Sequence, residues 1–161
     1  DRTGRSDHAI SMALGEAGSL TRREDGKPLT SNGRHVSSSH AGPLTMAVAA
    51  AQRAGCDIEP VAPRDEQAWR GLLNDAGQRL AALIAESSRE CRNTSGTRVW
   101  SATECLKKAG FSAVAPLTLD AATDDGWVML RSGDQRIATF AALTQNFETP
   151  LVIAVLAGAS S

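Results

Sequence analysis

Short turn signals recur along this chain and limit what it can fold into. The pairs Asp25-Gly26, Asn32-Gly33 and Asp125-Gly126 are typical of tight hairpin turns, because Gly and Asn accept the positive φ angles that such turns need. Apolar or alternating runs flank them, as expected for antiparallel strands. We therefore predict strands over residues 20–23, 28–30, 34–38, 45–51, 55–60, 117–121, 126–131, 136–143 and 151–156.

Longer stretches without such turns predict helices. Residues 98–110 contain no Pro and no Gly before Gly110, which stands where a helix usually ends. Residues 63–88 place apolar side chains three and four positions apart, so Trp69 is predicted to lie in the core. Three further expectations are a helix from Ser6 or Asp7 to Gly15, a poorly ordered linker at 1–6 and a loop at 87–96.

The helix at 98–110 carries an aromatic, an acidic and a basic residue on one face. Trp100, Glu104 and Lys108 are each four positions apart, so they line up along one side of the helix. An ordinary half-buried helix with an exposed ion pair has the same pattern. The stripe alone therefore does not identify a site.

A second acidic element lies upstream, at Asp57 and Glu59. If residues 55–60 are extended, both carboxylates point to the same side, because strand side chains alternate with a period of two. With Glu104 they would offer three oxygen ligands of the kind that Mg²⁺ prefers when it also binds phosphate. A single metal site follows only if this strand packs against the helix at 98–110.

The motifs together resemble the 4′-phosphopantetheinyl transferases of the surfactin-synthetase-activating type. In that family an acidic strand precedes a Trp-Ser-x-Lys-Glu-x-x-x-Lys helix, and this chain has Gly-Cys-Asp-Ile-Glu and then Trp-Ser-Ala-Thr-Glu-Cys-Leu-Lys-Lys. Ser39-His40 matches a Ser-His pair on an earlier strand, and Gly26-Lys27-Pro28 matches a Gly-Lys-Pro turn. The part after Glu104 is most similar to the transferase domains at the C-terminal end of enediyne-type iterative polyketide synthases.

The resemblance implies an α+β fold of two related lobes, about 7–54 and 55–158, with antiparallel strands packed on helices and the first lobe shortened. It implies Mg²⁺-dependent transfer of 4′-phosphopantetheine from coenzyme A to a serine of an acyl carrier protein, in polyketide biosynthesis. Glu104 would take the serine proton and Lys108 would offset phosphate charge. The implied coenzyme A contacts are Lys27, Ser39, His40 and Lys108, and the implied magnesium ligands are Asp57, Glu59 and Glu104.

One position departs from the family pattern, since Thr103 stands where the helix usually has Lys before its Glu. This keeps a second function open, a module that binds coenzyme A or a carrier protein without turnover. A purely structural domain, with the acids as surface charge, is a third. The short first lobe is expected to be completed by a parent synthase or by other copies of this chain.

The composition of the 161 residues limits the kinds of partner that we expect for this chain. The chain has 17 basic against 18 acidic residues, so it lacks the excess positive charge of a nucleic-acid groove or a polybasic membrane surface. With only 3 cysteines, we expect neither a disulfide framework nor a zinc cluster. A reducing cytoplasm is therefore the expected location. No apolar run approaches the ~20 residues of a membrane span. A start at Asp1 without Met is expected of a domain cut from a longer polypeptide.

Overall fold

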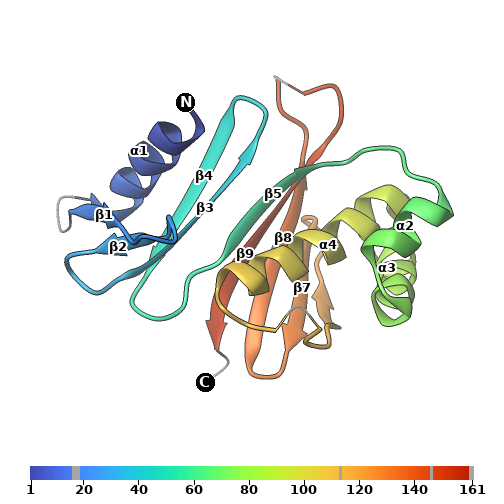
Figure 1. Cartoon of the computed structure of the whole chain (residues 1–161). Coiled ribbons are helices and arrows are strands. Elements are labelled where there is room, and N and C mark those ends of the chain that lie inside the picture. Colours follow the sequence, from blue (N-terminus) through green and yellow to red (C-terminus); the bar gives the residue numbers. More distant parts are fainter. Residues whose placement is uncertain (16–18, 113, 146, 160–161) are drawn as a thin grey trace.

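The structure is a computed structural model that describes residues 1–15, 19–112, 114–145 and 147–159. It combines α-helices with antiparallel sheets, so the α+β class is confirmed (Figure 1). None of the helices in the described ranges is both long enough and apolar enough to cross a membrane.

The larger sheet collects the strands of the C-terminal half, which are β5 (Cys56–Pro60), β6 (Thr118–Ala122), β7 (Trp127–Ser132), β8 (Gln135–Ala142) and β9 (Leu151–Ala159). Their order is β5-β9-β8-β7-β6, and every neighbouring pair is antiparallel. The chain therefore places the acidic strand β5 at one edge of the sheet, next to the C-terminal strand β9. All these strands lie where the sequence predicts them, to within a few residues.

Helices α3 (Asp75–Ser88) and α4 (Arg92–Lys108) pack on this sheet, with α4 lying across it, and α2 (Glu66–Leu72) packs on these two helices (Figure 1). The core forms between apolar side chains of α3 and α4 and those of β7, β8 and β9. Trp69 is 2% exposed, which confirms its predicted place in the core. The helical stretch is broken at Asn74, whose side chain caps α3 by accepting a hydrogen bond from the backbone N–H of Gly77.

Helix α3 ends at Ser88 and α4 begins at Arg92, so the predicted loop at 87–96 is confined to residues 89–91. Hydroxyl groups that would favour a loop instead bond to the helix backbone: Ser95 Oγ donates to the carbonyl of Arg92, and Thr97 Oγ1 to that of Asn93. Gly96 is also required, because a Cβ there would lie 2.8 Å from the ring of Trp69. The close packing of α2 on α4 thus accounts for a glycine inside a helix.

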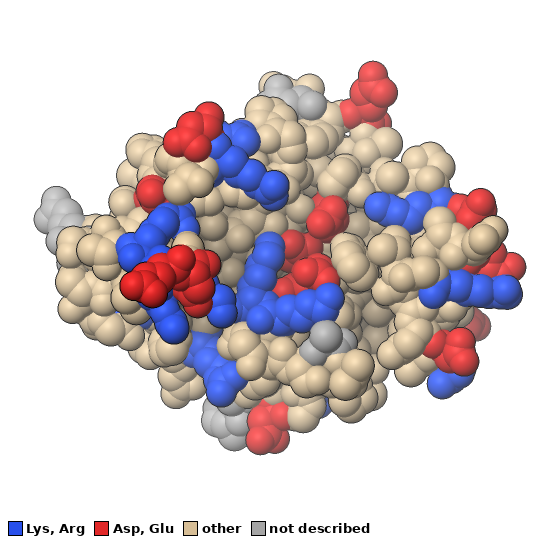
Figure 2. Space-filling model, in the orientation of Figure 1, with Lys and Arg blue, Asp and Glu red and all other residues tan. Residues whose placement is uncertain are grey.

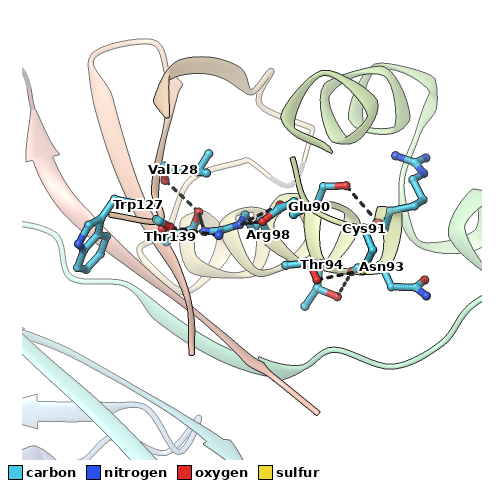
Figure 3. A network of polar contacts seen from close by, with 12 residues as sticks. Glu90, Cys91, Asn93, Thr94, Arg98, Trp127, Val128 and Thr139 are labelled. Carbon is cyan, nitrogen blue, oxygen red and sulfur yellow. Dashed lines mark hydrogen bonds and ion pairs between the residues drawn. The ribbon is translucent and has the colours of Figure 1, made fainter. Parts of the chain in front are cut away.

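A buried guanidinium fastens α4 to the sheet (Figure 3). Arg98 is 3% exposed, and its Nε donates to both carboxylate oxygens of Glu90, at 3.0 and 3.1 Å. Its Nη1 donates to the carbonyl and the hydroxyl oxygen of Thr139 on β8, and its Nη2 donates to the carbonyl of Gly126. The charge is therefore paired, and the helix is tied to β8 and to the turn before β7.

The N-terminal half contains α1 (Arg2–Leu14) and the strands β1 (Leu20–Arg22), β2 (Pro28–Thr30), β3 (His35–Ala41) and β4 (Leu44–Ala50). These strands form two hairpins, β1-β2 and β3-β4, and α1 packs against the second of them (Figure 1). The prediction of a linker at 1–6 is wrong. The Asp1 carboxylate accepts hydrogen bonds from the backbone N–H groups of Thr3 and Gly4 and so starts α1 early.

The two halves meet where β3 lies beside β5. The two strands belong to different sheets, and serine side chains bridge them. Ser37 Oγ accepts the backbone N–H of Cys56 at 3.2 Å, and Ser39 Oγ accepts that of Ile58 at 3.3 Å. Alternate serines of β3 therefore satisfy backbone donors at the edge of the larger sheet, where an unpaired N–H would be costly.

Candidate functional site

Three side chains from distant parts of the chain are in direct contact at this junction. Lys108 Nζ, near the end of α4, lies 2.8 Å from Asp57 Oδ1 on β5 and 2.9 Å from Ser39 Oγ on β3. The Ser39 hydroxyl donates to the same Asp57 oxygen at 2.9 Å and accepts from Lys108 and the Ile58 amide, so its hydrogen-bonding capacity is filled. The structure thus brings together residues that the sequence places in three separate motifs.

Local sequence explains why Asp57 points at α4. Its neighbour Ile58 faces the other way and packs with Ala41 and Leu151, so the alternation of the strand turns Asp57 toward the helix. Gly55, just before β5, allows the close approach. A Cβ on Gly55 would lie 2.3 Å from the carbonyl oxygen of Cys105, so no larger residue fits between strand and helix.

Glu59 and Glu104 lie close enough to this cluster for electrostatic interaction with the charges of Asp57 and Lys108. Burial raises the pKa of the Glu59 carboxyl, and the negative charges of Asp57 and, to a smaller extent, Glu104 raise it further, against the opposing effect of Lys108. Glu104 is itself 25% exposed and forms an ion pair with Lys107. Lys107 also lies over the ring of Trp100, 5.2 Å from its centroid.

The carboxylates of this region provide oxygen ligands of the kind that a hard divalent cation prefers. Asp57 Oδ2 is buried and has no hydrogen-bond partner among the described residues, which leaves one oxygen for such an ion. Asp57, Glu59 and Glu104 are the acids that would hold it. In the described ranges, however, no three His, Cys, Asp or Glu side chains are arranged as a ready metal cage, and the Lys108 ammonium lies against Asp57 Oδ1.

A basic pocket of 530 Å³ opens next to the cluster. Its walls come from the β1-β2 hairpin, the start of β3 and the end of α4, and Lys27 and Lys108 both line it. Figure 2 shows basic side chains gathered in the middle of this face beside a smaller acidic group. Such a pocket is suited to a ligand that carries several negative charges. Its basic side chains are Arg23, Lys27, Arg34, Lys107 and Lys108.

His40 lies on the side of β3 opposite to Ser39. Its Nε2 is 2.8 Å from Ser6 Oγ on α1, and its Nδ1 is 2.9 Å from Thr45 Oγ1 on β4. Burial lowers the pKa of His40, and the positive charges of Arg2, Arg5 and Lys108 lower it further. His40 is therefore held as a neutral hydrogen-bonding residue between α1 and the β3-β4 hairpin.

Sequence reasoning missed Arg23, Arg34 and Lys107 as pocket residues. No local pattern indicates that a hairpin and the end of a distant helix share one pocket, because the contacts that join them are long-range. Thr103, the residue that departs from the family pattern, lies elsewhere. Its Oγ1 donates to the carbonyl of Val99, and it lines a separate cavity of 160 Å³ beside α2 and α3.

No protein-family model matches the chain, and no curated protein matches it either. The resemblance to phosphopantetheinyl transferases rests on four short motifs between Gly26 and Gly110. Side chains from three of these motifs, Ser39, Asp57 and Lys108, are in contact, and the fourth contributes Lys27 to the adjoining pocket.

Proposed function

We propose that this chain is a phosphopantetheinyl transferase, which moves the 4′-phosphopantetheine arm of coenzyme A to a serine of an acyl carrier protein. The observation that carries the proposal is the contact of Lys108 with Asp57 and Ser39 at the edge of a basic pocket. Coenzyme A is a nucleotide with a pyrophosphate and a 3′-phosphate, so it needs several cations in one place. The setting would be polyketide biosynthesis in the cytoplasm.

Binding and charge compensation are the main tasks of such an enzyme, since phosphoryl transfer depends on positioning and on stabilising charge at the phosphate oxygens. Lys27 and Lys108 approach the pocket from opposite halves of the chain, so a ligand between them would be held by both. Asp57, Glu59 and Glu104 would hold Mg²⁺, which supplies positive charge at the pyrophosphate.

The reaction needs one proton acceptor near the phosphorus. The serine oxygen of the carrier bonds to the phosphorus that bears the pantetheine arm, and the bond from this phosphorus to the bridging oxygen breaks. Adenosine 3′,5′-bisphosphate leaves. Glu104 takes the serine proton, because it lies one helical turn before Lys108 on the same face of α4 and is partly open to solvent.

The fold that we assign with this function has two related lobes, at about 7–54 and 55–158. In support, each half has antiparallel strands with a helix packed on them, α1 on the β3-β4 hairpin and α4 on the larger sheet. The first half is the smaller of the two. The parent synthase or further copies of the chain would extend it.

A binding module without turnover is the second candidate. Two observations favour it: Thr103 supplies no charge, and the Lys108 ammonium already neutralises Asp57, one of the proposed metal ligands. Such a module would bind coenzyme A and leave the carrier unmodified.

Incubation of the chain with apo-acyl carrier proteins, coenzyme A and MgCl₂, followed by mass spectrometry of each carrier, separates the two. We expect the carrier to gain the mass of one phosphopantetheine arm. Glu104→Gln should slow the transfer at least ~100-fold, as expected for loss of a general base. Glu86→Gln, an exposed acid on α3, is the matched control and should transfer at the wild-type rate. Binding of coenzyme A with no mass gain on any carrier would leave the binding module.

A further inference from the structure

His40 cannot bind a phosphate without losing bonds that it already makes. Ser6 and Thr45 occupy its two ring nitrogens, at 2.8 and 2.9 Å. It does not line the basic pocket, and its neighbours on β3 that do, His35 to Ser38, lie nearer the start of the strand. A cation that already lines the pocket is therefore better placed than His40 to contact the 3′-phosphate of a bound nucleotide.

Arg34 lines the basic pocket and is suitably placed to contact this phosphate. It follows the turn at Asn32-Gly33, where Gly33 has a φ of 69°, and it comes directly before β3. The pocket lining includes Arg34, the first half of β3 and Lys108. Because Lys108 contacts Ser39 further along the strand, Arg34 and Lys108 lie toward opposite ends of this stretch. If Lys108 lies at the pyrophosphate, next to the reacting centre, the other end of the pocket takes the nucleotide end of the ligand.

Arg34 also differs from the other cations of the pocket in its pairing. Within the described residues its guanidinium has no acidic partner, and its Nη2 donates only to the carbonyl of Ala49, at 3.3 Å. A guanidinium can give two parallel hydrogen bonds to a phosphate, so this side chain is suited to a terminal phosphate group. The other cations each pair with a carboxylate: Arg23 and Lys27 with Asp25, Lys107 with Glu104, and Lys108 with Asp57.

We propose that Arg34 binds the 3′-phosphate of coenzyme A and so sets the preference for coenzyme A over its 3′-dephospho form. This inference rests on the proposed function for the identity of the ligand. It places the 3′-phosphate contact in the β2-β3 turn, whereas the resemblance implies a coenzyme A contact at His40.

The test measures affinity with and without the 3′-phosphate. Isothermal titration calorimetry would give dissociation constants of the chain for coenzyme A and for 3′-dephospho-coenzyme A. We expect Arg34→Gln to weaken coenzyme A binding ~10-fold or more and to leave the dephospho form nearly unchanged, because only one charged contact is lost. Arg34→Lys keeps the positive charge but cannot give two parallel hydrogen bonds to one phosphate. Its affinity for coenzyme A should lie between those of the wild-type chain and Arg34→Gln. Arg79→Gln, an exposed arginine on α3, is the matched control.

His40→Gln tests the competing assignment, in which His40 contacts the 3′-phosphate. Its amide can still bond to a hydroxyl group, and the preference for the 3′-phosphate should survive. Loss of the preference in His40→Gln with retention in Arg34→Gln would overturn the assignment, as would a wild-type chain that binds both compounds equally. Transfer to a carrier is measured separately. A chain that binds with the Arg34-dependent preference but never modifies a carrier refutes the transferase and keeps the phosphate contact.

Discussion

Asp57 keeps a carboxylate almost entirely out of water, since its side chain is 3% exposed. One oxygen accepts from Ser39 and Lys108, and the other has no partner in the described part of the chain. Burial of a charge on this scale is tolerated only when an opposite charge is close. The Lys108 ammonium is that charge, so it contributes to stability as well as to the proposed chemistry.

Lys108→Met should therefore lower the free energy of unfolding by about 1–3 kcal/mol, because it leaves a buried carboxylate without its cation. Urea unfolding measures this change. Lys107→Met is the matched control: the Lys107–Glu104 pair is more exposed, and its loss should cost less than about 1 kcal/mol. Adding Asp57→Asn to Lys108→Met should restore part of the loss. Equal losses in the two lysine variants would contradict this account of Asp57.

Glu59 makes stability depend on pH in a defined direction. Burial and the nearby negative charges raise the pKa of this carboxyl in the folded chain above its unfolded value. Between these two pKa values the folded chain binds more protons than the unfolded chain, so its stability falls as pH rises through that window. Glu59→Gln removes the effect and should become more stable relative to wild type as pH increases.

Urea unfolding of Glu59→Gln and wild type at several pH values from about 4 to 7 measures the difference. The samples should contain a chelator, since a bound cation would favour the charged form of Glu59. Glu86→Gln, on the exposed face of α3, serves as the comparison. Parallel stability curves for Glu59→Gln and wild type would show that this carboxyl is not coupled to folding.

At the scale of the element, α4 matters most because it carries Glu104 and Lys108. Its position depends on Arg98, which joins Glu90, Thr139 and Gly126 through buried hydrogen bonds (Figure 3). Any loosening of this network would shift the whole helix relative to β5, and with it the contact between Lys108 and Asp57.

Arg98→Met should cost about 3–5 kcal/mol in the free energy of unfolding, because it leaves the largely buried Glu90 carboxylate without a cation. Arg98→Lys should recover little of the loss, since an ammonium cannot reach three groups in the plane of a guanidinium. Arg98→Met with Glu90→Leu should be more stable than Arg98→Met alone. A loss below about 1 kcal/mol in Arg98→Met would show that packing alone holds α4.

Elements whose signals are local could be predicted, and those that depend on tertiary packing could not. The strands around Asp25-Gly26 and Asp125-Gly126 follow from turn chemistry alone. The start of α4 does not, because Gly96 is needed there only to make room for the Trp69 ring, and the hydroxyl groups near it bond to helix carbonyls.

The same limit applies to the candidate site. The period of two in β5 predicts that Asp57 and Glu59 share a side, and the negative charge of Asp57, which raises the pKa of Glu59 after burial, agrees with it. The contact of Ser39 with Asp57 and the place of Arg34 in the pocket depend on how β3 lies against β5. No pattern within either segment contains that information.

At the scale of the whole molecule, the two halves are joined through serine side chains in place of a continuous backbone ladder. Ser37 and Ser39 alternate with Ser38, whose hydroxyl turns the other way and donates to Ser6 on α1. One short run of serines therefore connects β3 to α1 on one side and to β5 on the other.

Ser37→Ala tests whether these serine bonds help to join the two halves, because it removes the acceptor of the Cys56 amide. We expect a loss of about 1–3 kcal/mol in the free energy of unfolding and faster hydrogen exchange at Cys56. Ser38→Ala is the matched control and should leave the exchange rate of Cys56 unchanged. Unchanged exchange at Cys56 in Ser37→Ala would mean that the bond contributes nothing to joining the halves.

The ion pair between Lys108 and Asp57 has one more consequence, for how the protein can be handled and made. Among the described residues Asp57 is the most buried acid, and the chain supplies its counterion from its own sequence. We therefore expect newly made protein to fold at low magnesium concentration and a purified sample stored in EDTA to stay folded.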